Sequence, residues 1–186
     1  MGRGGLEPPA STPPLPLRRT LGFVRQLAAG TPIFQGKGVT AVSEVDDFLL
    51  AVMPRQHDAD LAMLNGDAEP RKRLWSHQDP VTVLGAAKTV SGWSAVGNLF
   101  DWLAENFSNG TSYRLDVTAA GVSGDLGYVV GSEHSEASVG GRAPASIALR
   151  VTLIFRRESG EWKEIHRHAD PIPGIQSTEE QLGRLT

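Results

Sequence analysis

A stretch near the end of the chain, residues 147–155, alternates between apolar and mixed positions, which is the pattern of a strand with one buried face, and a tight turn separates it from a second expected strand. In this stretch every odd position is apolar, namely Ile147, Leu149, Val151, Leu153 and Phe155. The even positions are mixed, and they include Arg150 and Thr152. We therefore expect two long paired strands, over residues 145–156 and 162–170.

The segment between these strands predicts a three-residue hairpin loop, Glu158-Ser159-Gly160, in which Gly160 takes the left-handed conformation. In that register Arg150 lies opposite His168, and Thr152 lies opposite His166. One face of the sheet would then gather a polar set of Arg150, Thr152, His166, His168 and, at the strand end, Asp170. We expect any chemistry of the chain to lie on that face.

Helical spacing of apolar residues precedes the strands. Ser43 is a suitable N-cap before an acidic first turn and an apolar stripe that runs to Leu64, although Pro54 predicts a kink or break near Met53. Further helices are expected over 67–74 and from Trp93 onward, with a strand over 81–84 between them and strands over 111–120 and 125–134 after them. Helices followed by long antiparallel strands give an α+β fold.

Several motifs together resemble one known superfamily. They read LNGDAEPRKRLWS at 64–76, GW at 92–93, GDLGYVVG at 124–131, LRVTLIFRRESGEW at 149–162 and HRHAD at 166–170. This combination resembles the SnoaL-like branch of the nuclear transport factor 2 (NTF2-like) superfamily, which also contains ketosteroid isomerase, the polyketide cyclases and limonene epoxide hydrolase. The resemblance covers about Val45 to Pro171, and the closing hairpin is its most specific part.

The resemblance implies a cone, in which N-terminal helices pack on a strongly curved, mostly antiparallel sheet and a pocket opens at one end. It also implies a homodimer formed through the sheet, for which the apolar odd face of 147–155 is the expected surface. It does not imply one reaction, because a fold does not determine a function. No aspartate here matches the isomerase base residue by residue, and Asp79 is the nearest by type only. The Asp, Arg and Asp set of the epoxide hydrolase likewise has no ordered match, although Arg150 and Asp170 supply the residue types.

The first candidate site lies on the last strand. His166, His168 and Asp170 share one face and are the candidate catalytic groups, because a histidine titrates near neutral pH and a carboxylate can orient it. Arg150 is the candidate oxyanion or carboxylate binder, with Thr152 beside it. Three interpretations stay open for this set: a structural polar lining, a ligand-binding site and a catalytic site.

Other candidate ligand-binding residues lie earlier in the chain. Trp75 is a candidate pocket floor near His77 and Asp79, and Tyr128 offers a phenol in mid-strand. A zinc site would need a third ligand beside His166 and His168, from His77, Asp79, Glu133 or His134, and no spacing in the sequence fixes that geometry, so we expect no metal. We expect no other cofactor.

Composition narrows the class of protein. The net charge of −3 over 186 residues provides no basic stripe for a nucleic-acid partner. The chain has no cysteine, which excludes disulfides and thiolate chemistry and suits a reducing compartment. No apolar run reaches the roughly 20 residues that span a bilayer. Arg18-Arg19 is compatible with twin-arginine export, but Arg25 and Gln26 interrupt the apolar stretch that follows, so we expect a soluble cytoplasmic protein.

The domain organisation expected from these patterns has three parts. Residues 1–40 are rich in proline and glycine and predict a disordered or weakly structured extension, residues 43–172 form the SnoaL-like domain, and residues 173–186 form a polar tail. The leading hypothesis is a protein that binds a small, partly apolar, oxygen-bearing molecule, with or without cofactor-free acid–base catalysis of the isomerase, cyclase or hydrolase kind. The alternative is a non-enzymatic binding or dimerisation module.

Overall fold

The computed structural model describes residues 43–182, which begin with helix α2 (Glu44–Met63). Ser43 caps this helix as predicted. Its hydroxyl accepts a hydrogen bond from the Asp46 amide at 3.1 Å, and the Asp46 carboxylate accepts one from the Ser43 amide at 3.3 Å. The expected break near Met53 is wrong, because α2 continues through Pro54. Proline removes the bond to the carbonyl of Leu50, four residues earlier. Leu50 is 66% exposed, so water can reach that part of the helix.

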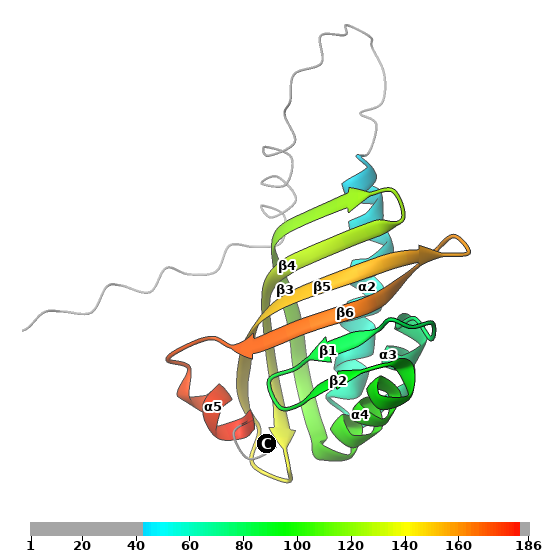
Figure 1. The fold of residues 1–186 in the computed structure, drawn as a ribbon. Helices are drawn as coiled ribbons and strands as arrows, with labels where there is room; N and C mark the ends of the chain where they lie inside the picture. Colours follow the sequence, from blue (N-terminus) through cyan, green and yellow to red (C-terminus); the bar gives the residue numbers. More distant parts are fainter. Residues whose placement is uncertain (1–42, 183–186) are drawn as a thin grey trace, which may run out of the picture. The chain divides into compact units, whose positions relative to one another are not determined.

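The next elements are helix α3 (Glu69–Leu74), strands β1 (Thr82–Leu84) and β2 (Thr89–Ser91), and helix α4 (Trp93–Asn106). Helix α4 begins where its apolar spacing predicted. The Asp79 carboxylate caps it by accepting a hydrogen bond from the Trp93 amide at 2.9 Å. Helices α3 and α4 lie beside β1 and β2 (Figure 1).

Four long strands complete the sheet: β3 (Phe107–Ser123), β4 (Leu126–Val139), β5 (Ala145–Glu158) and β6 (Glu161–Pro171). The strand order is β2-β1-β6-β5-β4-β3, and only the β1–β6 pair is parallel. Helix α2 lies along one face of this sheet (Figure 1). The predicted α+β fold, with N-terminal helices on a mostly antiparallel sheet, is confirmed.

The register of the last hairpin differs from the expected one in two places. Glu158 pairs with Glu161, so the loop has only two residues, Ser159 and Gly160, both with positive φ (50° and 88°). This is the geometry of a type I′ turn, whose twist matches that of paired strands. A bulge then leaves Ile165 unpaired between the Phe155–Glu164 and Ile154–His166 pairs.

These two differences add up to a slip of two residues along β6. Arg150 therefore pairs with Asp170, and Thr152 pairs with His168, so the expected Arg150–His168 and Thr152–His166 pairs are wrong. A slip of two residues preserves the side-chain face. The predicted polar set therefore still shares one face of the sheet.

The apolar odd face of β5 packs inside the domain. The ring of Phe48 from α2 lies edge-on to Phe155 and Trp162, with centroids 5.5 and 4.9 Å apart. Val151 and Leu153 are buried in the same cluster. The expectation that this face is free for a partner chain is wrong, because α2 covers it. The even positions of β5 form the outer face of the sheet.

The end of the described chain forms helix α5 (Gln176–Leu182), where the sequence indicated only a polar tail. Strand β6 pairs with β5 only as far as Leu149. At Ala148, the next residue of β5, the backbone groups form hydrogen bonds with the segment just before α5 and with α5 itself. The Ala148 amide donates to the Thr178 hydroxyl at 2.9 Å, and the Ala148 carbonyl accepts from the Ile172 amide at 3.2 Å.

No helix among residues 43–182 is long and apolar enough to cross a membrane. The predicted extension, residues 1–40, lies outside the described residues.

Candidate functional site

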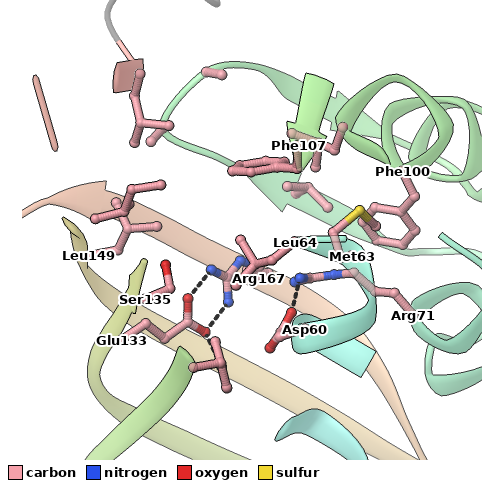
Figure 2. A pocket seen from close by; sticks show the side chains of 17 residues that line it. Asp60, Met63, Leu64, Arg71, Phe100, Phe107, Glu133, Ser135, Leu149 and Arg167 are labelled. Atoms are coloured by element: carbon pink, nitrogen blue, oxygen red, sulfur yellow. Dashed lines mark hydrogen bonds and ion pairs between the residues drawn. The ribbon is translucent and has the colours of Figure 1, made fainter. Parts of the chain in front are cut away.

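The inner face of the sheet, α2 to α4 and α5 together line a cavity of about 120 Å³ (Figure 2). One part of its wall is apolar and includes Met63, Leu64, Phe100, Leu103, Phe107 and Leu149. The other part carries polar and ionisable side chains, namely Asp60, Arg71, Tyr113, Glu133, Ser135 and Arg167. We call this second part the polar wall.

The first ion pair of the polar wall joins two strands. Glu133 on β4 lies opposite Leu149, and Arg167 on β6 lies opposite Leu153, so both follow the inward face of β5. The Arg167 guanidinium donates two parallel hydrogen bonds to the Glu133 carboxylate, at 2.6 and 2.5 Å. The Tyr113 hydroxyl donates a third at 2.9 Å. This bidentate geometry fixes both side chains in place.

The second ion pair joins two helices. Arg71 of α3 donates a hydrogen bond to the Asp60 carboxylate of α2, and the Gln56 amide nitrogen donates another to Asp60 at 2.7 Å. The Arg71 guanidinium also lies 5.3 Å from the ring centroid of Phe100. Its Nε atom is buried and has no hydrogen-bond partner among the described residues.

Glu164 is the one inward carboxyl group in the described β-sheet that has no hydrogen-bond partner. It lies opposite Phe155 on β6, is fully buried, and neither of its carboxyl oxygens meets a donor. The bulge at Ile165 brings Glu164 and Arg167 to the same face, although they are three positions apart. Burial raises the pKa of Glu164 to about 8, against the opposing influence of Arg71 and Arg167. The group is therefore mainly protonated at neutral pH.

The other buried groups have pKa values that follow from their partners. Burial acts to raise the pKa of Glu133, but the Arg167 guanidinium more than offsets it, and the net shift is downward. Burial raises the pKa of Tyr113 well above its usual value. Burial acts to lower the pKa of Arg167, but the Glu133 charge raises it overall. The Arg167–Glu133 pair is therefore ionised, whereas Glu164 beside it is neutral.

The polar residues predicted from the hairpin lie on the outer face of the sheet, away from this cavity. Arg150, Thr152, His168 and Asp170 surround an open depression of about 330 Å³, which we call the outer depression. Arg150 donates a hydrogen bond to Asp170, and the two side chains are 57% and 38% exposed. His166 is brought instead to β1, where its Nδ1 lies 2.7 Å from the Thr82 hydroxyl. Partial burial, followed by the neighbouring His168, lowers the pKa of His166.

The other predicted ligand-binding residues are dispersed. Trp75 is buried against Phe100 in the core and does not line the cavity as a floor. His77 stacks on Trp93 at 3.8 Å between ring centroids, and Asp79 caps α4. Tyr128 is exposed on the outer face. Among the described residues, no group of three or more His, Cys, Asp or Glu side chains could hold a metal ion.

The sequence reasoning missed most of the polar wall. The signal that could have identified its strand residues is cross-strand pairing. The apolar side chains of β5 mark the inward face, and the polar residues opposite them are Glu133, Glu164 and Arg167. Asp60 and Arg71 lie on helices, where cross-strand pairing does not apply. No pattern in the sequence distinguishes them from the other polar residues of those helices.

Comparison with known proteins identifies the family. The model of the SnoaL-like domain matches residues 57–172, which is more than half of the chain. No curated protein matches the chain in sequence.

Solved structures agree with this fold. A candidate calcium/calmodulin-dependent protein kinase II association domain from Xanthomonas campestris is 13% identical, with a TM-score of 0.57 over 78% of this chain and 100% of that chain. A candidate dehydratase of the NTF2-like family from Streptomyces avermitilis is 23% identical, with a TM-score of 0.57 over 69% and 99%. An NTF2-like superfamily protein from Salmonella enterica serovar Typhimurium is 17% identical, with a TM-score of 0.53 over 67% and 96%. At these identities the similarity shows the fold alone, which is NTF2-like. The match to the family model shows that the chain belongs to the SnoaL-like domain family.

Proposed function

We propose that this protein binds a small, partly apolar molecule carrying an oxygen function, and that the binding site is the cavity inside the cone. The observation that carries this proposal is the division of the cavity into an apolar wall and a polar wall. Small-molecule sites have this composition, mostly apolar with a few fixed polar groups. Apolar side chains of similar volume in place of the buried ion pairs would stabilise the fold as well, because charged groups are expensive to desolvate. The presence of the ion pairs therefore favours a binding role over a purely structural one.

The protonation states of the two inward glutamates support acid–base chemistry at this site. Arg167 keeps Glu133 ionised, while burial keeps Glu164 protonated up to a pKa of about 8. Two neighbouring carboxyl groups with pKa values pushed apart can accept and supply a proton at the same pH. Glu133 lines the cavity and is the candidate acceptor, whereas Glu164 does not line it and would need an intervening group or water to pass its proton to a ligand. Such a proton transfer needs no cofactor, and it is the kind of step on which an isomerase, cyclase or hydrolase reaction would depend.

The outer depression is a weaker candidate for the same ligand. A ligand there would meet Arg150, His168 and Asp170, with His166 nearby as the remaining predicted catalytic group. However, Arg150 already pairs with Asp170, and both are substantially exposed. Water screens such an exposed pair, so its contribution to binding is small.

Two serines on β4 allow these sites to be separated. Ser135 lines the cavity, and Ser132, three positions earlier, lines the outer depression. We expect Ser135→Trp to abolish binding of benzyl alcohol, phenol and cyclohexanone in ligand-observed NMR, and Ser132→Trp to leave it unchanged. Ser135→Leu is a smaller block if the tryptophan variant does not fold, as judged by circular dichroism. Loss of binding in Ser132→Trp alone would move the site to the outer depression, and no binding by the unaltered protein would refute a pocket for such molecules.

A second candidate function is a non-enzymatic dimerisation module. The outer face of the sheet exposes Leu126 and Tyr128, at 51% and 45% exposure, and these large apolar surfaces favour an association with another chain. A small-molecule site and a dimer surface on opposite faces of one sheet are compatible. If no probe binds in the cavity but the protein forms dimers, the non-enzymatic dimerisation module is the favoured function.

A further inference from the structure

The size of the cavity limits the ligand that the proposed function requires. The cavity measures about 120 Å³. For comparison, an apolar protein cavity of about 150 Å³ accommodates one benzene molecule. A single six-membered ring with a short substituent is therefore about what the cavity can enclose, and a fused-ring compound would need the walls to move apart or would extend out of the cavity.

The charges of the polar wall cancel among themselves. Arg167 is matched by Glu133, and Arg71 is matched by Asp60. All four side chains are at least nine-tenths buried. The wall therefore presents two complete ion pairs, with no unmatched charge to receive a charged ligand.

An anionic ligand would have to compete with a carboxylate that is already in place. Binding a carboxylate to Arg167 means breaking the bidentate contact with Glu133, which would leave that carboxylate buried without a counter-ion. An unpaired buried charge costs several kcal/mol. The same two arginines act to lower the pKa of the buried Glu164, but they do not offset the effect of its burial, so a further carboxylate near them is not fully compensated.

A cationic ligand is also disfavoured. Asp60 and Glu133 are already engaged by arginines and further donors, namely Gln56 and Tyr113. Glu164 could become a counter-ion only by losing its proton, and it is not among the residues that line the cavity.

The remaining accessible hydrogen-bond donor suits a neutral oxygen. The Ser135 hydroxyl lines the cavity beside Glu133 and has no hydrogen bond of its own among residues 43–182 (Figure 2). The unpartnered Arg71 Nε–H is buried and out of reach of a ligand. An alcohol or carbonyl oxygen can accept from the Ser135 hydroxyl without disturbing either ion pair. We propose that the cone is selective for a neutral alcohol or carbonyl compound of one ring or an equivalent short chain, and that it excludes the corresponding carboxylate. This inference rests on the proposed function.

Probes matched in shape test the selectivity. The full chain is titrated at pH 7 with benzyl alcohol, benzoate, benzylamine and 2-naphthol, and the Kd of each is measured by NMR chemical-shift changes. We expect benzyl alcohol to bind, and benzoate and benzylamine to bind more weakly by a factor of about ten or more, as the desolvation of an unpaired charge requires. Phenol is titrated in the same way, and 2-naphthol should bind more weakly than phenol, although it is more apolar. All binding should be lost in Ser135→Trp and retained in Ser132→Trp.

The outcomes separate this inference from the proposed function beneath it. If benzoate or benzylamine binds as tightly as benzyl alcohol and Ser135→Trp abolishes that binding, the cone is the site but the selectivity for neutral ligands is wrong. If 2-naphthol binds in the cone more tightly than phenol, the size limit is wrong. If no probe binds, or if Ser135→Trp changes nothing, the proposed site in the cone fails.

Discussion

At the scale of single residues, the ionisable groups around the cone differ most in whether they have partners. Arg167 and Glu133 satisfy each other, as do Arg71 and Asp60, and these pairs hold strands and helices together through the core. Glu164 is close enough for both arginines to affect its pKa but has no hydrogen bond. A buried group without a partner makes the stability of the fold depend on pH.

The first prediction concerns that dependence. The pKa of Glu164 rises from the ordinary 4.5 to about 8 on folding, so the folded state holds its proton while the unfolded state releases it. The contribution to the free energy of unfolding is complete below pH 4.5 and is lost as the pH rises toward 8, by up to about 1.4 kcal/mol per pH unit. Glu164→Gln cannot ionise. Urea unfolding at pH 5.5, 7 and 8.5 should therefore show the variant gaining stability relative to the unaltered protein.

The comparison with Glu164→Gln isolates this one group. His166, whose pKa is lowered, contributes an opposite slope near its own titration range, but it does so in both proteins. Stability curves that run parallel over the three pH values would contradict a proton-bearing Glu164.

A second prediction compares a buried ion pair with an exposed one. Glu133→Gln leaves the Arg167 guanidinium buried without a counter-charge, so we expect a loss of roughly 3–5 kcal/mol in the free energy of unfolding. Asp170→Asn makes the same kind of change at the exposed Arg150 pair and should cost about 0–1 kcal/mol. Equal losses in the two variants, measured by chemical denaturation, would show that the Glu133 pair is accessible to water.

At the scale of the elements, the sequence predicted where the strands lie better than it predicted which face of each strand turns inward. Alternation identified β5, the turn after it indicated β6, and Ser43 identified the start of α2, because these patterns are local consequences of burial, turn formation and capping. The short strand β2 and helix α5 were missed. Helix α5 is held by a distant part of the chain, through the bond from the Ala148 amide to the Thr178 hydroxyl. Strand β2 is three residues long and pairs only with the equally short β1, so its alternation is too brief to identify it.

The location of the site could not be predicted because it depends on which face of the sheet turns inward. Alternation divides β5 into an apolar face and a polar face, and the polar face invited a catalytic interpretation. In the structure the apolar face turns inward, toward α2 and the cavity, and the functional candidates are the few polar residues that neighbouring strands contribute to that side, such as Glu133 and Arg167. The bulge at Ile165 also changes the parity of β6, and no residue type marks a bulge at that position.

A third prediction follows from the turn of the last hairpin. Both central residues have positive φ, and Ser159 pays a conformational cost there that asparagine reduces. We expect Ser159→Asn to raise the melting temperature by a few degrees, equivalent to about 0.5 kcal/mol. Gly160→Ala should lower stability by roughly 1 kcal/mol, because its φ of 88° disfavours a side chain. A three-residue loop with only Gly160 left-handed would respond to Gly160→Ala but not to Ser159→Asn.

At the scale of the whole molecule, the described domain uses the two faces of its sheet differently. The inner face is closed by α2 and surrounds the cavity, while the outer face carries the outer depression and the exposed apolar side chains of β4. The dimer expected through the sheet must therefore use the outer face, since the odd residues of β5 are already buried within the chain.

The last prediction tests that dimer. Leu126 and Tyr128 project from the outer face, with the side chain of Ile154 opposite Tyr128 on β5. In a two-fold dimer each altered residue occurs on both sides of the interface, so Tyr128→Glu places two carboxylates in or beside the same contact. We expect the unaltered protein to be a dimer by light scattering at tens of micromolar and Tyr128→Glu to be a monomer. Leu50→Glu is the control, because Leu50 is also a large exposed hydrophobic residue, at 66%, but it lies on α2 rather than on the sheet. A monomeric unaltered protein would refute the dimer, whereas dissociation by Leu50→Glu but not by Tyr128→Glu would move the interface to the helix.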